Sequence, residues 1–208
     1  MHRHLKICVP LVFMLMLTAC SEAPRPAAET PKEPEKPAEP VTGRFAFHQM
    51  FVAARGWAQD VQVLGLSSIN LSEVKSEPGE AGAWQAIFAS QSRGQARMYT
   101  YSVVEAAGNL HKGVFAGLEE TYTGPRGQAR PFNPAAIKTD SDEVFQTAMK
   151  HGAEYAKKNP DMPISFLLEL TPRFPNPAWR VIWGESVSTS SFSIYIDAAT
   201  GKYLQTMR

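Results

Sequence analysis

The sequence contains only two cysteines, Cys8 and Cys20, and both lie within the first twenty residues. Residues 21–208 therefore have no thiol for a disulfide, so packing alone must stabilise any fold that they form. Long apolar runs are also missing. The run at Ile7–Leu17 spans 11 residues and contains Pro10, whereas a membrane-spanning helix needs about 20 apolar residues. We therefore expect this run not to be a permanent membrane span.

The sequence also lacks an excess of basic side chains. Its 21 Lys and Arg residues oppose 20 Asp and Glu residues, for a formal net charge of +1. Without residues 1–19, which contain Arg3 and Lys6, 19 basic residues (21 − 2) oppose 20 acidic ones and the charge is −1. Nucleic-acid binding requires a clustered basic excess. We predict no nucleic-acid partner.

The N-terminus has the arrangement of a signal peptide, with a basic segment at residues 2–6 followed by the apolar run. The run ends in Leu17-Thr18-Ala19-Cys20, where small residues precede a cysteine. This motif resembles the lipobox of bacterial lipoproteins. The resemblance implies that residues 1–19 are removed and that Cys20 becomes the first residue, with diacylglycerol on its sulfur and usually an acyl group on its amine. An ordinary secretory signal with an incidental cysteine is the alternative.

The lipoprotein resemblance also implies a location. Two or three acyl chains, at about 0.8 kcal/mol per buried methylene, give stable anchoring to a membrane. Ser21 follows the cysteine, whereas an Asp at this position favours inner-membrane retention in enteric-type lipoproteins. We therefore expect a protein of the cell envelope, anchored in the outer membrane and facing the periplasm.

A proline-rich segment follows the cysteine, and we assign residues 20–43 as lipidated Cys20 plus a tether. Within residues 22–42, prolines recur at positions 24, 26, 31, 34, 37 and 40 with charges between them. Such a sequence favours an extended, polyproline-like chain. At roughly 3 Å per residue, it could hold the remaining 165 residues up to about 60 Å from the lipid. A spacer of tuned length and a generic leash both fit.

The remaining residues contain a weak duplication. Ala83–Phe88 (AWQAIF) is similar to Ala178–Trp183 (AWRVIW) at an offset of 95. Val104–Leu110 (VEAAGNL) is similar to Ile196–Lys202 (IDAATGK), which places Gly108 and Gly201 at an offset of 93, and Phe51 and Phe145 lie in helical patterns at an offset of 94. These landmarks predict two repeated units, residues 44–124 and 140–208, joined by a linker at residues 125–139.

Each unit is predicted to begin with a helix and continue with strands. Asp140 and Glu143 have capping-box spacing before a helical pattern that stops at Asn159-Pro160, and the first helix covers about Arg44–Ala58. Residues 164–171 and 192–197 alternate as strands do, and Gly108 and Gly201 suit tight hairpin turns. The fold class is therefore α+β, with each helix packed on a three- or four-stranded antiparallel sheet.

Residues 191–204, preceded by Trp179-Arg180-Val181, resemble the closing hairpin of a PepSY-type domain, in which a strand ends in an Asp-Ala-x-Thr-Gly turn. The resemblance covers about residues 140–208 and implies a PepSY/cystatin-like fold. In the first unit Glu105 stands at the aspartate position, so the same assignment there rests on the internal repeat. PepSY-type modules have been proposed to inhibit peptidases or modulate neighbouring proteins, so the resemblance implies an envelope protein or a peptidase as partner.

Catalytic and metal-binding patterns are not found. His48, His111 and His151 share no zinc-type spacing with another ligand, and no Gly-x-Ser-x-Gly motif is present. We predict no metal, no cofactor and no enzymatic activity, with an unrecognised enzyme site as the remaining alternative. The Asp197 side chain is expected to stabilise its own turn. The tryptophans at positions 84, 179 and 183 are expected in the core.

The best candidate for a partner-binding loop is the connection between the units. It carries Tyr122, Arg126, Arg130 and Phe132 in a segment without helical or strand periodicity, although a plain linker also fits. The leading hypothesis is a non-catalytic envelope binding module that modulates a peptidase. The alternative is a structural accessory lipoprotein of an envelope or cell-wall assembly. The sequence leaves the oligomeric state open.

Overall fold

A computed structural model describes residues 37–125, 127 and 129–208. The predictions for residues 1–36, including the signal peptide, Cys20 and most of the tether, lie outside the described residues, as does Arg126. In chain order the elements are β1 (Val41–Thr42), α1 (Gly43–Trp57), β2 (Gln62–Ile69), β3 (Glu80–Ala81), β4 (Ala83–Ser90), β5 (Gln95–Ser102), β6 (Gly113–Thr121), the 3-10 helix η1 (Pro134–Ala136), α2 (Ser141–Lys158), β7 (Ile164–Glu169), β8 (Ala178–Trp183), β9 (Phe192–Asp197) and β10 (Tyr203–Met207).

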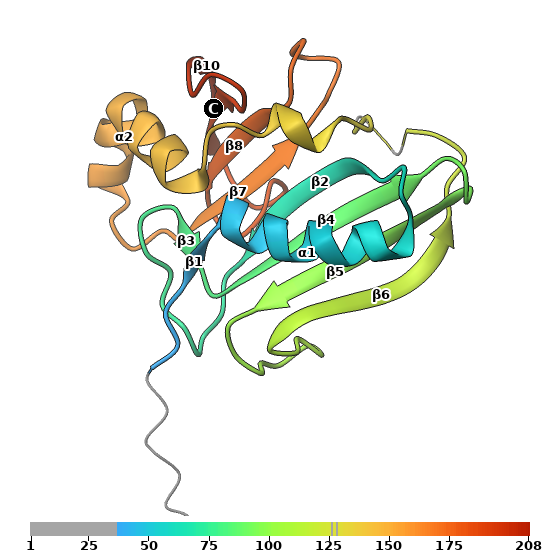
Figure 1. The fold of residues 1–208 in the computed structure, drawn as a ribbon. Helices are drawn as coiled ribbons and strands as arrows, with labels where there is room; N and C mark the ends of the chain where they lie inside the picture. The colour runs from blue at the N-terminus through green and yellow to red at the C-terminus, as the bar shows by residue number, and fades with distance from the viewer. Residues whose placement is uncertain (1–36, 126, 128) are drawn as a thin grey trace, which may run out of the picture. The chain divides into compact units, whose positions relative to one another are not determined.

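The fold is α+β, as expected, and its main element is one antiparallel sheet of eight strands in the order β10-β9-β8-β7-β2-β4-β5-β6 (Figure 1). Helix α1 packs on β4 and β5, and α2 packs on β8 and β9. Buried side chains from both helices join one hydrophobic cluster with Trp84 and Trp179. Both helices therefore cover the same face of the sheet.

The sheet joins an N-terminal half, α1 with β2, β4, β5 and β6, to a C-terminal half, α2 with β7 to β10. The two halves share this sheet through the neighbouring strands β2 and β7. The register of this junction comprises only two residue pairs, Leu66 with Leu168 and Ser67 with Leu167.

The helix bounds agree with the sequence pattern to within a residue. Thr42 is the N-cap of α1 and Asp140 is the N-cap of α2. Phe51 lies nine residues after the N-cap of α1 (51 − 42) and Phe145 lies five after the N-cap of α2 (145 − 140), so Phe47, and not Phe51, has the same position in α1 that Phe145 has in α2. Apolar residues recur at every turn of an amphipathic helix, which makes a one-turn slip easy.

The N-termini of the two helices meet at Asp140. Its Oδ1 accepts hydrogen bonds from the backbone N–H of Arg44 (2.9 Å) and of Ser141 (2.7 Å), and its Oδ2 accepts one from the Thr42 hydroxyl (2.8 Å). The Ser141 hydroxyl oxygen accepts a further bond from the Gly43 N–H (2.7 Å). Asp140, the N-cap of α2, and Ser141, its first residue, thereby satisfy N–H groups at the start of α1, which have no partner inside their own helix.

Two tryptophans make equivalent contacts in the two halves. The indole N–H of Trp84 donates to the carbonyl of Val41 (2.9 Å), and that of Trp179 donates to the carbonyl of Thr139 (3.2 Å). Each carbonyl belongs to the residue immediately before an N-cap. Both rings are fully buried, as the sequence predicts. Each tryptophan thus fixes the start of the helix that covers it.

Asp197 stabilises its own turn, as expected. Its Oδ1 accepts bonds from the N–H groups of Ala199 and Thr200 and from the Thr200 hydroxyl, and its Oδ2 accepts one from Asn176. Burial raises the pKa of Asp197, but the hydrogen bonds from Asn176, Thr200 and Ala199 outweigh burial and lower it overall. Gly201 in this turn has φ +68°, as the predicted hairpin requires.

The connection between the halves is part of the sheet region. Arg130 donates its N–H to the carbonyl of Leu170 (2.8 Å), and Phe132 exchanges two backbone hydrogen bonds with Val63 (2.9 Å each). Residues 130–132 therefore bond to both strands beyond their short junction. Among the described residues, no helix is long and apolar enough to cross a membrane.

Candidate functional site

The two aromatic residues of the predicted partner-binding loop are internal. Tyr122 packs with Leu64, Ala89 and Ala96, and the Phe132 ring belongs to the main core. Both rings are less than a tenth exposed, whereas the Arg130 side chain faces solvent. The sequence does not predict this burial, because the Gly and Pro residues around the loop interrupt any strand pattern. The two short β-bridges, Val63 with Phe132 and Arg130 with Leu170, therefore leave no signal in the sequence. Of the predicted loop residues that the structure describes, Arg130 has an exposed side chain, and binding of a partner by this loop stays a prediction.

The histidines do not come together. His111 lies 3.3 Å from a carboxylate oxygen of Glu105, and His151 stacks on Tyr203 with the ring centres 3.9 Å apart. His48 lies on the other helix, beside the groove described next. The described part of the chain contains no group of three or more His, Cys, Asp or Glu side chains placed to hold a metal ion.

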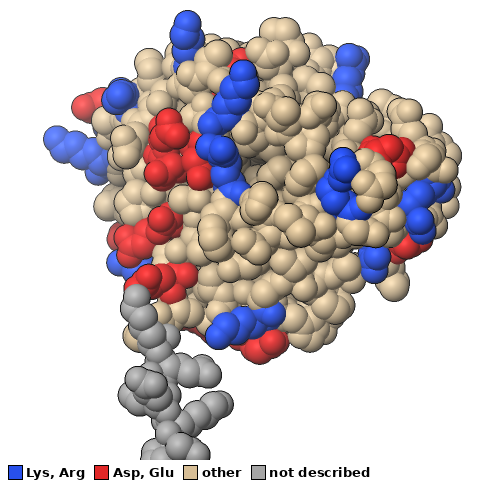
Figure 2. Space-filling view, viewed as in Figure 1, with Lys and Arg blue, Asp and Glu red and all other residues tan. Residues whose placement is uncertain are grey.

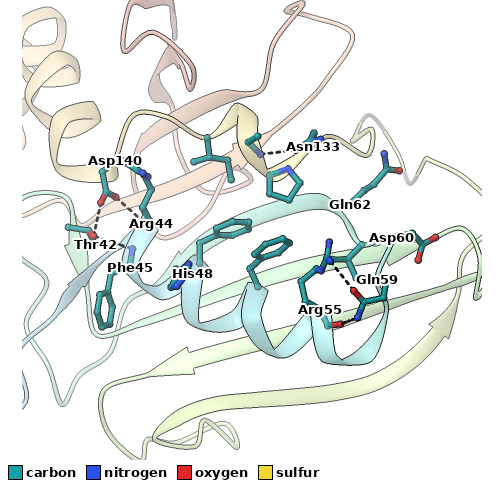
Figure 3. Close-up of a pocket in the computed structure, with 16 residues that line it drawn as sticks. Thr42, Arg44, Phe45, His48, Arg55, Gln59, Asp60, Gln62, Asn133 and Asp140 are labelled. Atoms are coloured by element: carbon teal, nitrogen blue, oxygen red, sulfur yellow. Dashed lines mark hydrogen bonds between the residues drawn. The ribbon is translucent and has the colours of Figure 1, made fainter.

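An open groove of about 910 Å³ lies between α1 and the segment around η1. Figure 3 shows α1 along one side and Asn133 with its neighbours along the other. Asp140 and Thr42 lie at one end, and Gln59, Asp60 and Gln62 lie at the other. The groove exists because the connecting segment runs alongside α1 without covering it.

Aromatic rings form the floor of the groove. Phe47 and Phe51 stack nearly parallel, with ring centres 5.8 Å apart and an angle of 11°. Phe88 of the sheet holds both rings from beneath, at centroid distances of 5.7 and 6.2 Å. Pro134, Ala135 and Ile137 add apolar surface on the opposite wall. The floor is therefore rigid and apolar.

Basic side chains lie along the rim. Arg44, His48 and Arg55 are exposed and share one side of α1, because their spacings of four and seven residues match whole helical turns. Arg44 donates from Nη1 to the carbonyl of Lys138 (3.0 Å), and Arg55 donates from Nη2 to Gln59 Oε1 (2.9 Å). Each guanidinium is positioned by one bond and retains other N–H donors.

Two carboxylates also line the groove, so its formal charges balance, but their oxygens bond within the protein. Asp60 accepts hydrogen bonds from the Ser90 hydroxyl (2.6 Å) and the Ser92 N–H (2.9 Å), and these bonds lower its pKa from 3.8 to about 2. Asp140 caps the two helices. The N–H groups of Arg44 and Arg55 are therefore the charged hydrogen-bonding groups best placed for a ligand.

This arrangement suits binding. Its apolar floor lies between two positioned cations. Figure 2, drawn from the same side as Figure 1, shows uncharged surface over α1 with basic side chains near both ends. The sequence signal was the recurrence of Arg44, His48, Phe51 and Arg55 on one helical face, but the opposite wall comes from the linker.

A second hollow lies on the sheet face away from the helices. It measures about 740 Å³, and its lining contains no charged residue. Met98, Phe115 and Leu118 contribute exposed apolar surface there, with Leu118 89% exposed. The side chains that would orient a charged ligand are found at the groove along α1, which we therefore take as the candidate site.

Comparison with known proteins gives one structural likeness. No protein-family model matches the chain, and no curated protein sequence matches it. Among solved structures, the fold is similar to the crystal structure of a "putative lipoprotein" from Clostridium difficile 630. That likeness has a TM-score of 0.47 and 10% sequence identity, and it covers 83% of this chain and 95% of the other.

Proposed function

We propose that this chain is a lipid-anchored cell-envelope protein whose folded part is a non-catalytic binding module. The lipobox-like motif at Cys20 supports the anchor, and Ser21 supports placement at the outer membrane, facing the periplasm. The observation that carries the binding role is the groove along α1. Its apolar floor and its positioned arginines offer both contact area and orientation to a partner.

We further propose that the two halves are repeated PepSY-like units. The equivalent bonds of Trp84 and Trp179 support the duplication, because each indole N–H donates to the carbonyl of the residue before the N-cap of the helix in its own half. The family resemblance makes a peptidase the first partner to examine. On this proposal the module modulates that peptidase by occupying its surface, without chemistry of its own.

Site-directed photo-crosslinking in cells tests the proposal. A photo-reactive residue at His48 in the groove is compared with one at Thr200, which is exposed in the last hairpin. We expect His48 to capture a specific envelope protein, and we expect Cys20→Ser to abolish both that capture and incorporation of labelled palmitate. Identical capture from the two positions, or none from His48, would contradict the binding module and favour a structural accessory role.

A further inference from the structure

The basic residues of the groove have a fixed spacing. Arg44 and Arg55 are eleven residues apart on one helix, which corresponds to about 16 Å along the axis at 1.5 Å per residue. An extended peptide rises about 3.3 Å per residue, so roughly five residues span the same length. Resting on the proposed function, we propose that the groove binds an extended acidic segment of a partner protein, with two carboxylates four or six residues apart, because side chains on the same side of an extended chain are an even number of residues apart.

The course of the groove suits an extended peptide. The groove runs along α1, with the η1 segment on its other side. An extended segment lying parallel to α1 between these two walls would place one carboxylate at each arginine.

The hydrogen-bonding groups favour carboxylates. A guanidinium binds a carboxylate through two parallel N–H···O bonds, and this geometry gives orientation as well as attraction. Arg44 and Arg55 are already positioned by the Lys138 carbonyl and by Gln59, so less side-chain freedom is lost on binding. The oxygens of Asp60 and Asp140 bond to groups of the protein itself. They do not compete for the two guanidinium groups through hydrogen bonds.

The apolar floor of the groove determines which residue types the bound peptide should carry between its two carboxylates. Between the two arginines, the stacked rings of Phe47 and Phe51 face Pro134, Ala135 and Ile137 across the groove. An extended chain directs alternate side chains to opposite sides. We therefore expect apolar residues at the inward positions between the two carboxylates, where they contact the rings.

Fluorescence anisotropy with synthetic peptides tests the inference on the full chain in detergent. The probe is a labelled nine-residue peptide with glutamates at positions 2 and 6, which lie on the same side of an extended chain, and apolar residues between them. The control peptides carry glutamine at both positions, or glutamates only two residues apart. We expect each control peptide to bind at least about tenfold more weakly than the probe, and we expect probe binding to weaken with added salt.

Matched variants locate the contact. Arg44→Gln and Arg55→Gln should each weaken binding of the probe about tenfold, whereas Arg173→Gln, at an exposed arginine beside Tyr195, should leave it unchanged. Arg44→Lys and Arg55→Lys keep the charge but lose the paired N–H donors, so they should bind the probe more weakly than the unchanged protein and more tightly than the Gln variants. Thermal melts confirm that each variant is folded.

Equal binding of the acidic and neutral peptides, an equal loss with Arg173→Gln, or no binding of the probe would overturn the inference. Those results would leave the proposed function standing if the photo-crosslinker at His48 still captures an envelope protein. Failure of that capture would remove the proposed function itself.

Discussion

The carboxylate of Asp140 accepts a hydrogen bond from the backbone N–H of Arg44, so one side chain caps two helices whose N-caps lie 98 residues apart. An N-cap contributes about 1–2 kcal/mol to stability. We therefore expect Asp140→Ala to lower the free energy of unfolding by about 2–4 kcal/mol, as measured by urea denaturation. Asn133→Ala, which removes the cap of the short η1 helix, is the control and should cost about 1 kcal/mol. A loss no larger than that of the control would show that Asp140 caps only its own helix.

The two indole N–H bonds should have comparable energetic effects. Replacing Trp84 or Trp179 by Phe removes the donor and leaves the carbonyl of Val41 or Thr139 without it, at a cost of about 1–3 kcal/mol each. Since the bond of Trp179 is buried and that of Trp84 is only partly buried, we expect the larger loss for Trp179→Phe. Denaturation curves of the two variants measure this difference. An unchanged stability in either variant would argue against a role in fixing the helix start.

Two glycines in the helices should respond in opposite ways to alanine. A Cβ at Gly152 would lie 2.8 Å from Trp183 Cη2 and 3.1 Å from Ile194 Cδ1, whereas nothing lies within 4 Å of one at Gly56. We expect Gly152→Ala to destabilise the protein by about 1–3 kcal/mol through overpacking. Gly56→Ala should stabilise it by about 0.5–1 kcal/mol through helix propensity. Thermal melts measure both changes, and an unchanged or raised melting temperature for Gly152→Ala would refute the close approach of α2 to the sheet.

The hydrogen bonds of Asp60 should make stability depend on pH in the acid range. The Ser90 hydroxyl and the Ser92 N–H lower the pKa of Asp60 from 3.8 to about 2 in the folded protein. A depressed folded-state pKa adds stability above the unfolded pKa, and this stability is lost as the pH falls from about 4 to about 2. In Ser90→Ala, we expect the pKa of Asp60, followed by NMR titration, to rise toward 3.8. An unshifted titration would show that Ser90 does not hold this carboxylate.

Local signals account for the elements that the sequence predicts well. The end of α2 follows from Asn159-Pro160 and its start from Asp140, whose capping preference is a property of the residue itself. The turn at Gly201 likewise follows from the short motif Asp-Ala-Ala-Thr-Gly at residues 197–201. By contrast, the junction of β2 and β7 depends on two residue pairs far apart in the chain, and no local pattern distinguishes those leucines from other strand residues.

The candidate site was less predictable, because its lining comes from three segments of the chain, at residues 42–55, 59–62 and 133–140. The rim residues Arg44 and Arg55 are visible as one face of a helix. Their opposite wall, at Pro134 and Ile137, lies in a segment without periodicity. The bonds from Phe132 to Val63 that hold this segment in place are backbone bonds, which carry little sequence information.

The start of α1 also has a mechanical consequence. A pulling force that enters the described domain through residues 37–40 first reaches Val41 and Thr42. Those residues pair with β3, and bonds from Trp84 and to Asp140 tie them to both halves of the sheet. Tension is therefore shared among several bonds loaded in parallel, so the domain resists being peeled apart from its N-terminal end.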